Sequence, residues 1–219
     1  MLQKKAALAQ WFRRAYPVGS FPEGVAFDGA NIWVTNGNGV TKLRASDGRN
    51  LGTFPVGNGP SGIAFDGTNI WVTYGDWVAN GSGVMKLRAS DGANLGAFPA
   101  GNGPSGVAFD GTDVWVVNTD DSTVTKLRAS DGIQLGTFAL SLQPSGALAF
   151  DGANLWVGGD IPGGEGVTKV RASDGAILGV FGTEFIGYVG GAVFDGAHIW
   201  VAVQTDCCQP NAPPKLTKF

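Results

Sequence analysis

The feature that most constrains this chain is a short phrase that occurs five times along it. The tripeptide Phe-Asp-Gly begins at Phe27, Phe65, Phe109, Phe150 and Phe194. Six residues after each of these phenylalanines stands a tryptophan, at Trp33, Trp71, Trp115, Trp156 and Trp200. Repetition at a period of about 44 residues is typical of proteins built from stacked supersecondary units, so we expect a repeat architecture.

A second phrase alternates with the first. Lys-Leu-Arg-Ala-Ser-Asp-Gly begins at Lys42, Lys86 and Lys126, and a copy with valine in place of leucine begins at Lys169. We align Lys215-Leu216, close to the end of the chain, as a shortened fifth copy. Each repeat therefore contains one phrase of each kind.

The second repeat predicts four short strands separated by turns. We expect strands over residues 63–65, 70–73, 84–88 and 95–98, because apolar and β-branched residues cluster there. Asp66-Gly67 and Asp91-Gly92 mark tight reversals, in which glycine supplies the positive φ angle. Four strands in a repeat of this length predict the blade of an all-β β-propeller, with antiparallel strands.

The number of strands predicts how the ring closes. The first three strands of the blade occur five times, whereas a fourth strand follows only at Leu51, Leu95, Leu135 and Leu178. Residues 16–19 align with residues 54–57, which directly follow a fourth strand. We therefore expect a five-bladed propeller closed by residues 12–16, which would complete the last blade and cover its open edge. The alternative is that the chain is part of a six- or seven-bladed ring.

Composition supports a well-buried globular chain. Of the 219 residues, 43% are hydrophobic and 15% are charged, and the unbroken repeat leaves no place for a linker. We expect one domain over residues 1–219, with residues 1–10 as a foreign or disordered leader. The apolar run at residues 6–9 is too short for a signal peptide or a membrane span, so we expect a soluble protein of unknown location.

Charge and cysteine content limit the binding partners and the catalytic chemistry that we expect. The net charge is −3 and no basic stripe is present, which argues against nucleic acid and anionic membranes as partners. We expect a monomer. The two cysteines, Cys207 and Cys208, are adjacent and cannot form a disulfide framework. Their loop holds neither histidine nor lysine that would lower a thiol pKa, which argues against a cysteine nucleophile.

The pattern in residues 59–73, Gly-Pro-Ser-Gly-Ile-Ala-Phe-Asp-Gly followed by Ile-Trp-Val-Thr, resembles the YVTN and NHL class of bacterial β-propellers, including its virginiamycin B lyase branch. The resemblance covers nearly the whole chain and implies a propeller. Members of the class include binding scaffolds, a lyase and other metal-assisted enzymes. The lyase type uses a histidine and a glutamate near magnesium, whereas the single histidine here, His198, aligns with the turn residues Asn31, Asn69, Asp113 and Asn154. The lyase chemistry is therefore not carried over, and no Ser-His-Asp triad can be assembled.

Residues that recur in every repeat serve the blade, and residues found in one repeat are candidates for a site. One recurring aspartate directly follows each phenylalanine of the first phrase, and another precedes the last glycine of the second phrase. We expect the first to cap the turn between the first two strands, and the second to cap the turn between the last two. The recurring lysines and arginines lie on the third strand, where we expect them to pair with carboxylates or lie over aromatic rings.

The unrepeated acids are gathered in particular connections. They are Glu23, Asp76, Asp113, Asp120, Asp121, Asp160, Glu165, Glu184 and Asp206. All except Asp113 lie in connections between the second and third strands or between the fourth strand and the next blade, which share one end of an up-and-down blade. They are either solvated loop acids or hard oxygen ligands for Ca²⁺ or Mg²⁺. For the cation site we select Asp76, Asp120, Asp121, Asp160, Glu165 and Asp206.

The same loops contain residues suited to an organic ligand. We select Glu23, Tyr74, Asp76, Trp77 and Glu184 as candidate ligand-binding residues. Trp77 has no counterpart in the other repeats, so it is either an exposed platform for a sugar or apolar ligand, or a lid for its own loop.

Two functions remain open from the sequence. The first is a binding or scaffold module that presents its acidic loop face to a small ligand, a cation or a protein. The second is a divalent-metal-dependent hydrolase or lyase, acting on an ester, lactone or phosphoester at the acidic mouth of the central channel. No catalytic residue is assigned.

Overall fold

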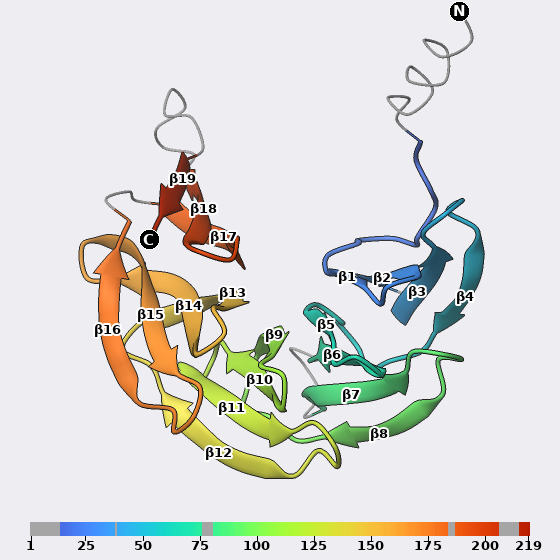
Figure 1. The fold of residues 1–219 in the computed structure, drawn as a ribbon, viewed down its shortest axis with the longest axis horizontal. Helices are drawn as coiled ribbons and strands as arrows, with labels where there is room; N and C mark the ends of the chain where they lie inside the picture. The colour runs from blue at the N-terminus through green and yellow to red at the C-terminus, as the bar shows by residue number, and fades with distance from the viewer. Residues whose placement is uncertain (1–13, 38, 76–80, 184–186, 206–214) are drawn as a thin grey trace, which may run out of the picture.

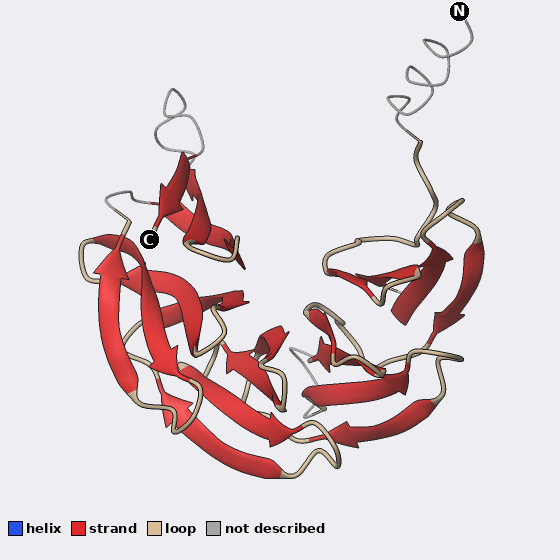
Figure 2. Cartoon of the chain, in the orientation of Figure 1, coloured by secondary structure: helices blue, strands red, loops and turns tan. Residues whose placement is uncertain are grey.

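The chain folds into an all-β five-bladed β-propeller (Figures 1 and 2). The computed structural model describes residues 14–37, 39–75, 81–183, 187–205 and 215–219. Five antiparallel sheets stand around a common axis, with the first strand of each sheet innermost (Figure 1). Within the described residues no helix is long and apolar enough to cross a membrane.

Each sheet follows the chain order. The first blade is β1 (Val25–Phe27), β2 (Asn31–Asn36), β3 (Gly39–Arg44) and β4 (Asn50–Phe54). The second is β5 (Ile63–Phe65), β6 (Asn69–Tyr74), β7 (Gly83–Arg88) and β8 (Asn94–Phe98). The third is β9 (Pro104–Phe109), β10 (Asp113–Asn118), β11 (Thr123–Arg128) and β12 (Gln134–Ala139). The fourth is β13 (Gln143–Phe150), β14 (Asn154–Ile161), β15 (Gly164–Arg171) and β16 (Ile177–Gly182), and the fifth is β17 (Gly187–Phe194), β18 (Ile199–Thr205) and β19 (Lys215–Lys218). The strands predicted in the second repeat are confirmed to within two residues.

The recurring aspartate caps the first turn of each blade, as predicted. In the second blade, Asp66 Oδ1 accepts the backbone N–H groups of Thr68 and Asn69, at 2.8 and 2.6 Å. Asp66 Oδ2 accepts the indole Nε1–H of Trp71 at 2.7 Å. Gly67 lies between them at φ +94°, a conformation that glycine adopts without strain. One carboxylate therefore fixes the turn and orients the core tryptophan.

The core lies between blades. Trp33, Trp71 and Trp115 are fully buried, and Trp156 is 8% exposed. Trp200, in the fifth blade, is only half-buried. The predicted role of the recurring lysines is confirmed in part, because each lies over its own tryptophan ring, as Lys42 does over Trp33 at 4.8 Å. The Lys42 ammonium also donates to backbone carbonyls of the next blade, a partner that the sequence did not predict.

The alignment of the last repeat was wrong by three residues. Trp33 pairs with Lys42 across β2 and β3, whereas Trp200 pairs with Lys218 across β18 and β19. Lys218 also lies over the Trp200 ring, at 5.4 Å. Lys218, and not Lys215, is therefore the counterpart of Lys42. The register could not be read from the sequence, because the loop before β19 differs in length from the corresponding loops of the earlier repeats.

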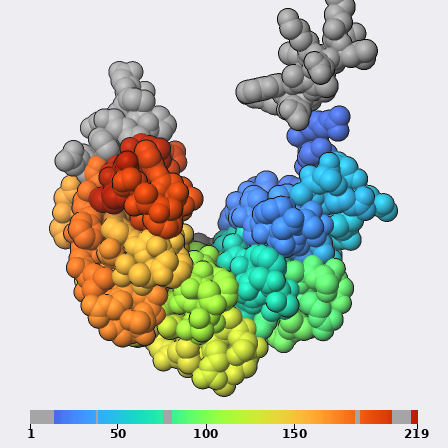
Figure 3. All heavy atoms as spheres, viewed as in Figure 1, coloured from blue at the N-terminus to red at the C-terminus, as the bar shows by residue number. Residues whose placement is uncertain are grey.

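The predicted closing strand is not seen as a strand. Residues 14–16 have no strand structure, residues 12 and 13 lie outside the described part of the chain, and the described fifth sheet consists of β17, β18 and β19. The first and last blades lie apart in the space-filling view (Figure 3). The Tyr16 ring lies against Gly48, as the Phe54 ring lies against Gly92 in the next blade. Tyr16 thus occupies the position of a fourth-strand aromatic residue beside blade 1, which supports its alignment with Phe54, while pairing with β19 stays a prediction.

Candidate functional site

The strongest candidate site is a pair of acidic side chains in the fourth blade. We call the end of the molecule that carries the β2–β3 type connections the loop face, and the opposite end the turn face. On the loop face, Asp160 lies near the end of β14 and Glu165 near the start of β15, and the two residues are direct partners in the antiparallel register. Gly163, in the turn between the strands, has a φ of +97°. This tight hairpin therefore places two carboxylates side by side.

The two acids differ in exposure. Asp160 is exposed, whereas Glu165 is only 5% exposed. The backbone N–H and the hydroxyl of Thr183 both donate to the Glu165 carbonyl, at 2.8 and 3.0 Å, which holds the end of β16 over this residue. Glu165 therefore lies beside Thr183, which directly follows β16.

The Glu165 carboxylate has little compensation for its burial. Its Oε1 accepts the backbone N–H of Gly187 at 3.3 Å, at the start of β17. Its Oε2 is buried and accepts no hydrogen bond from the described residues. Burying an unpaired carboxylate is costly unless a proton or a cation neutralises it. The structure thus leaves one acceptor atom of Glu165 unsatisfied.

The pKa of Glu165 is raised above its ordinary value. The largest cause is burial, which disfavours the charged form, and the neighbouring Asp160 carboxylate adds charge repulsion and a hydrogen bond to the protonated form. The hydrogen bond from Gly187 acts in the opposite direction and is weaker. The pair therefore favours uptake of one positive charge, either a proton or a cation.

The other two described acids of the predicted cation set lie in the third blade and have different surroundings. Both oxygens of Asp121 are used by Asn102, whose backbone N–H and side-chain amide donate at 2.7 and 2.9 Å. Asp120 is exposed and lies against Gly103. Asp121 thus braces the loop between blades 2 and 3, and Asp120 faces solvent.

Gln143 connects the two acidic regions. Its backbone pairs with Asp160 across β13 and β14. Its side-chain amide donates to the Thr119 carbonyl and accepts from the Ser122 hydroxyl in the β10–β11 turn. The acidic turns of blades 3 and 4 are therefore neighbours on the loop face, although among the described residues no group of three or more His, Cys, Asp or Glu side chains is arranged to hold a metal ion.

The remaining predicted residues are placed as follows. Glu23 is exposed, and its backbone N–H donates to the Thr35 carbonyl at 3.2 Å. Tyr74 is half-buried, with its ring against Gly57, so it packs on the preceding loop. The other candidates, Asp76, Trp77, Glu184 and Asp206, lie outside the described residues, as do Cys207 and Cys208.

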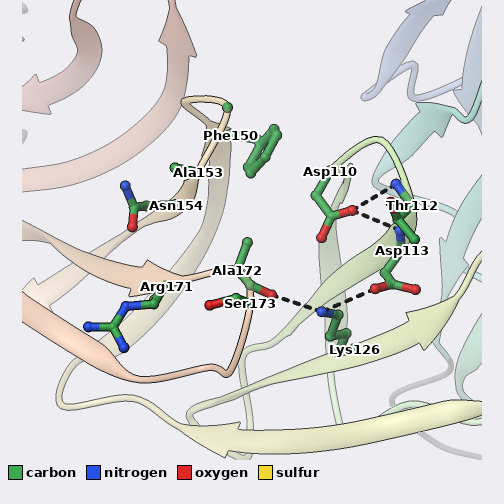
Figure 4. A pocket seen from close by; sticks show the side chains of 11 residues that line it. Asp110, Thr112, Asp113, Lys126, Phe150, Ala153, Asn154, Arg171, Ala172 and Ser173 are labelled. Carbon is green, nitrogen blue, oxygen red and sulfur yellow. Dashed lines mark hydrogen bonds and ion pairs between the residues drawn. The ribbon is translucent and has the colours of Figure 1, made fainter.

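A groove of 570 Å³ lies on the turn face between blades 3 and 4 (Figure 4). Lys126 contributes to its wall, with its ammonium 3.1 Å from Asp113 and 2.8 Å from the Ala172 carbonyl. Asp113 is the unrepeated acid that the sequence placed away from the loop face. Asp110 accepts three hydrogen bonds from its own blade, and Arg171 is paired with Asp174 at 2.8 Å. Because these charges already have protein partners, the groove is a blade junction with little free bonding capacity.

His198 lies in the first turn of the fifth blade, as its alignment predicted. Its backbone N–H donates to Asp195 Oδ1 at 2.8 Å, and its half-exposed ring nitrogen lies 3.8 Å from the same oxygen. This turn belongs to the turn face, at the other end of the blade from Asp160 and Glu165. The histidine therefore has no part in the acidic pair.

Comparison with known proteins shows the fold alone. No family model and no curated protein sequence matches the chain. The structure is similar to Kuenenia stuttgartiensis hydrazine synthase, with a TM-score of 0.72, 17% identity and coverage of 95% of this chain and 65% of that one. It is also similar to a functionally unknown protein from Desulfotomaculum acetoxidans DSM 771 (TM-score 0.68, 15% identity, 89% of this chain and 65% of that one).

A third similar structure is a protein of unknown function from Bacteroides caccae, with a TM-score of 0.68, 16% identity and coverage of 95% of this chain and 80% of that one. The chain therefore spans about two thirds of the length of the first two structures. At these identities the likeness confirms the β-propeller and carries no activity across.

Proposed function

We propose that the chain is a β-propeller binding module whose loop face takes up a cation, either a free divalent ion or a cationic group of a small ligand or protein. The observation that carries the proposal is the buried Oε2 atom of Glu165, which accepts no hydrogen bond from the described residues and lies beside a second carboxylate. A cation at this position would relieve both the burial cost and the repulsion between the two acids.

The donor set fits one class of cation best. Mg²⁺ and Ca²⁺ prefer oxygen ligands, and Mg²⁺ commonly keeps several waters while one or two carboxylates bind it. Asp160 and Glu165 would supply two carboxylates, and exposed Asp160 leaves room for waters. The described residues place no histidine beside the pair, because His198 lies on the turn face, and this argues against a preference for zinc.

The test is a melting scan of the full chain with chelator and with Ca²⁺, Mg²⁺, Mn²⁺ or Zn²⁺. An ion at 100 times its dissociation constant stabilises the folded state by about 2.7 kcal/mol, which is a measurable rise in melting temperature. The rise should be lost in Glu165→Gln and in Asp160→Asn. It should persist in the control Asp120→Asn, which removes an exposed acid of the same face. No rise with any of the four ions would overturn the cation site.

A catalytic function is the second candidate, favoured by the raised pKa of Glu165. A carboxyl group with a raised pKa keeps its proton to higher pH than an ordinary one and can act as a general acid, and a divalent ion beside it would polarise a substrate oxygen. The resemblance to the YVTN and NHL class belongs to this proposal, because that class contains both scaffolds and metal-assisted enzymes. Turnover of an ester, lactone or phosphoester that vanishes with chelator and with Glu165→Gln would support it. A panel with no metal-restored turnover would reject it and leave the binding module.

A further inference from the structure

The four contacts between successive blades are built from residues at equivalent positions of the repeat. Each blade presents a tryptophan side, formed by its second-strand tryptophan and by the third-strand apolar residue two positions before the lysine. The next blade presents a phenylalanine side, formed by the phenylalanine before the recurring aspartate and by the apolar residue two positions before that. In the first contact Trp33 and Val40 pack with Ile63 and Phe65. The later contacts repeat this pairing, as in Trp71 and Val84 of blade 2 with Val107 and Phe109 of blade 3.

These contacts are dry on the tryptophan side. The valines of the first four blades, Val40, Val84, Val124 and Val167, are all 0% exposed. The corresponding residue of the fifth blade is Leu216, because it pairs with Ala202 as Val40 pairs with Thr35. Leu216 is 59% exposed, and Trp200 beside it is only half-buried. The tryptophan side of blade 5 therefore has the composition of a blade contact, and no other blade in the described part of the chain packs on it.

The phenylalanine side of blade 1 is uncovered as well. Val25 is 63% exposed and Phe27 is 56% exposed, whereas their counterparts Ile63 and Phe65 pack into the core between blades 1 and 2. Ala45 is also exposed, although its counterpart in blade 2, Ala89, is 8% exposed. Two matching halves of one blade contact are thus present at opposite ends of the arc.

Hydrogen bonds from the third-strand lysine to the next blade accompany the apolar contact and fix how the two blades are aligned. Lys42 donates to the carbonyls of Ala89 and Ser90 in the next blade, at 2.6 and 3.1 Å, and Lys86 makes the same two hydrogen bonds to blade 3. Lys218 has the position of Lys42 in the fifth blade and is exposed. Its counterpart carbonyls are those of Ala45 and Ser46 in blade 1. The two end surfaces therefore match in their hydrogen-bonding groups as well as in their apolar residues.

We propose that the tryptophan side of blade 5 binds the phenylalanine side of blade 1 of a second copy of this chain. The two surfaces of one copy lie apart (Figure 3), and the four packed contacts between them fix the curvature of the arc. A head-to-tail contact between copies requires no change in those contacts, whereas contact within one copy would require at least one of them to shift. This inference replaces the monomer that we expected from the sequence. It is independent of the proposed cation site.

Two single variants and their mixture test the contact. Leu216→Asp destroys the tryptophan side and leaves the phenylalanine side intact, and Phe27→Asp does the reverse. Sedimentation with chelator present should show self-association of the unmodified chain that rises with concentration. Each variant alone should associate at least ~30-fold more weakly, the loss typical of a buried interface anchor. An equimolar mixture of the two variants should form a dimer and nothing larger, because one intact contact remains.

A matched control separates surface charge from the contact. Ile133→Asp introduces the same charge at a residue that is 53% exposed, in a turn of the third blade, and should associate like the unmodified chain. Circular dichroism and melting confirm that all three variants fold. An unmodified chain that stays monomeric at every concentration would overturn the proposal, as would variants that still associate or a mixture that remains monomeric.

Discussion

The two ends of the fourth blade hold carboxylates with opposite properties. At the turn face, before β14, Asp151 accepts the backbone N–H groups of Ala153 and Asn154 and the indole N–H of Trp156, at 2.9, 2.7 and 2.8 Å. Its pKa is lowered, because these hydrogen bonds together outweigh partial burial, which is the largest single influence and acts in the opposite direction. At the loop face, the Glu165 carboxylate accepts one long hydrogen bond from the described residues and has a raised pKa.

The difference shows that repeated and unrepeated acids have different roles in this fold. The aspartate of the turn face recurs in every blade and is surrounded by donors that its own turn supplies. Glu165 occurs once, and its carboxylate accepts one hydrogen bond from the described residues, from Gly187 of β17. The first kind of acid stabilises the fold when ionised, and the second is stabilised by a proton or a cation. The predictions below test this division, from the largest expected effect to the smallest.

The largest effect should come from the tryptophan that the recurring aspartate orients. Trp115→Ala should lower the free energy of unfolding by about 3–5 kcal/mol, because a fully buried ring is replaced by a cavity. Trp200→Ala should cost less, because that ring is only half-buried. Urea unfolding of dilute protein measures both. Equal losses at the two positions would contradict the unequal packing of inner and terminal blades.

A smaller loss should follow from removing the aspartate itself. Asp66→Ala should cost about 1–3 kcal/mol, because the buried indole N–H of Trp71 and the turn N–H groups lose their acceptor. Asp120→Ala, a change of the same kind at an exposed acid of the loop face, should cost less than about 0.5 kcal/mol. A loss at Asp120 as large as that at Asp66 would break the division between repeated and unrepeated acids.

The two kinds of acid should also give opposite pH dependence. The pKa of Asp195 is lowered from 3.8 to about 2, chiefly by the hydrogen bond from Trp200, and the pKa values of Asp66 and Asp151 are lowered as well. Stability from these groups is present above 3.8 and is lost as the pH falls through the lowered values. Stability from Glu165 is present below its ordinary value of 4.5 and is lost as the pH rises through its raised value.

Glu165→Gln isolates that second contribution. The glutamine variant stays neutral, so with chelator present the stability difference between it and the unmodified chain should move in favour of the variant as the pH rises from 4 to 8. Asp120→Asn should show no such drift. Melting curves at a series of pH values measure the difference, and a drift in favour of the unmodified chain would mean that Glu165 is stabilised in its charged form.

Much of the fold followed from the repeat, and the physical reason is that each repeat specifies its own blade. Phe65 predicts the end of a strand, Asp66 predicts a capped turn and Trp71 predicts a core ring. The hydrogen bonds that fix this arrangement all lie within the same repeat, because Asn69 and Trp71 both donate to Asp66. The register of β19 could not be predicted in this way, because the spacing between Trp200 and Lys218 depends on a loop that differs from those of the other repeats. The uncovered sides of blades 1 and 5 likewise depend on contacts between blades, which a single repeat does not encode.

The candidate site was only partly predictable. Counting unrepeated acids found Asp160 and Glu165, and their positions on either side of the Pro162-Gly163 turn could have shown that they are cross-strand partners. The burial of Glu165 could not be foreseen, since it arises from Thr183 and Gly187 of later strands. The sequence also grouped Asp121 with these acids, whereas the structure gives both of its oxygens to Asn102.

The central claim, that the acidic pair of blade 4 takes up a cation in place of a proton, is tested most directly by calorimetric titration with Ca²⁺ and Mg²⁺ at several pH values. We predict binding that tightens as the pH rises through the raised pKa of Glu165 and that releases protons to the buffer below it. Asp120→Asn should bind in the same way, and Glu165→Gln should not bind. Absence of heat with either ion at pH 8, or equal binding by Glu165→Gln, would contradict the account.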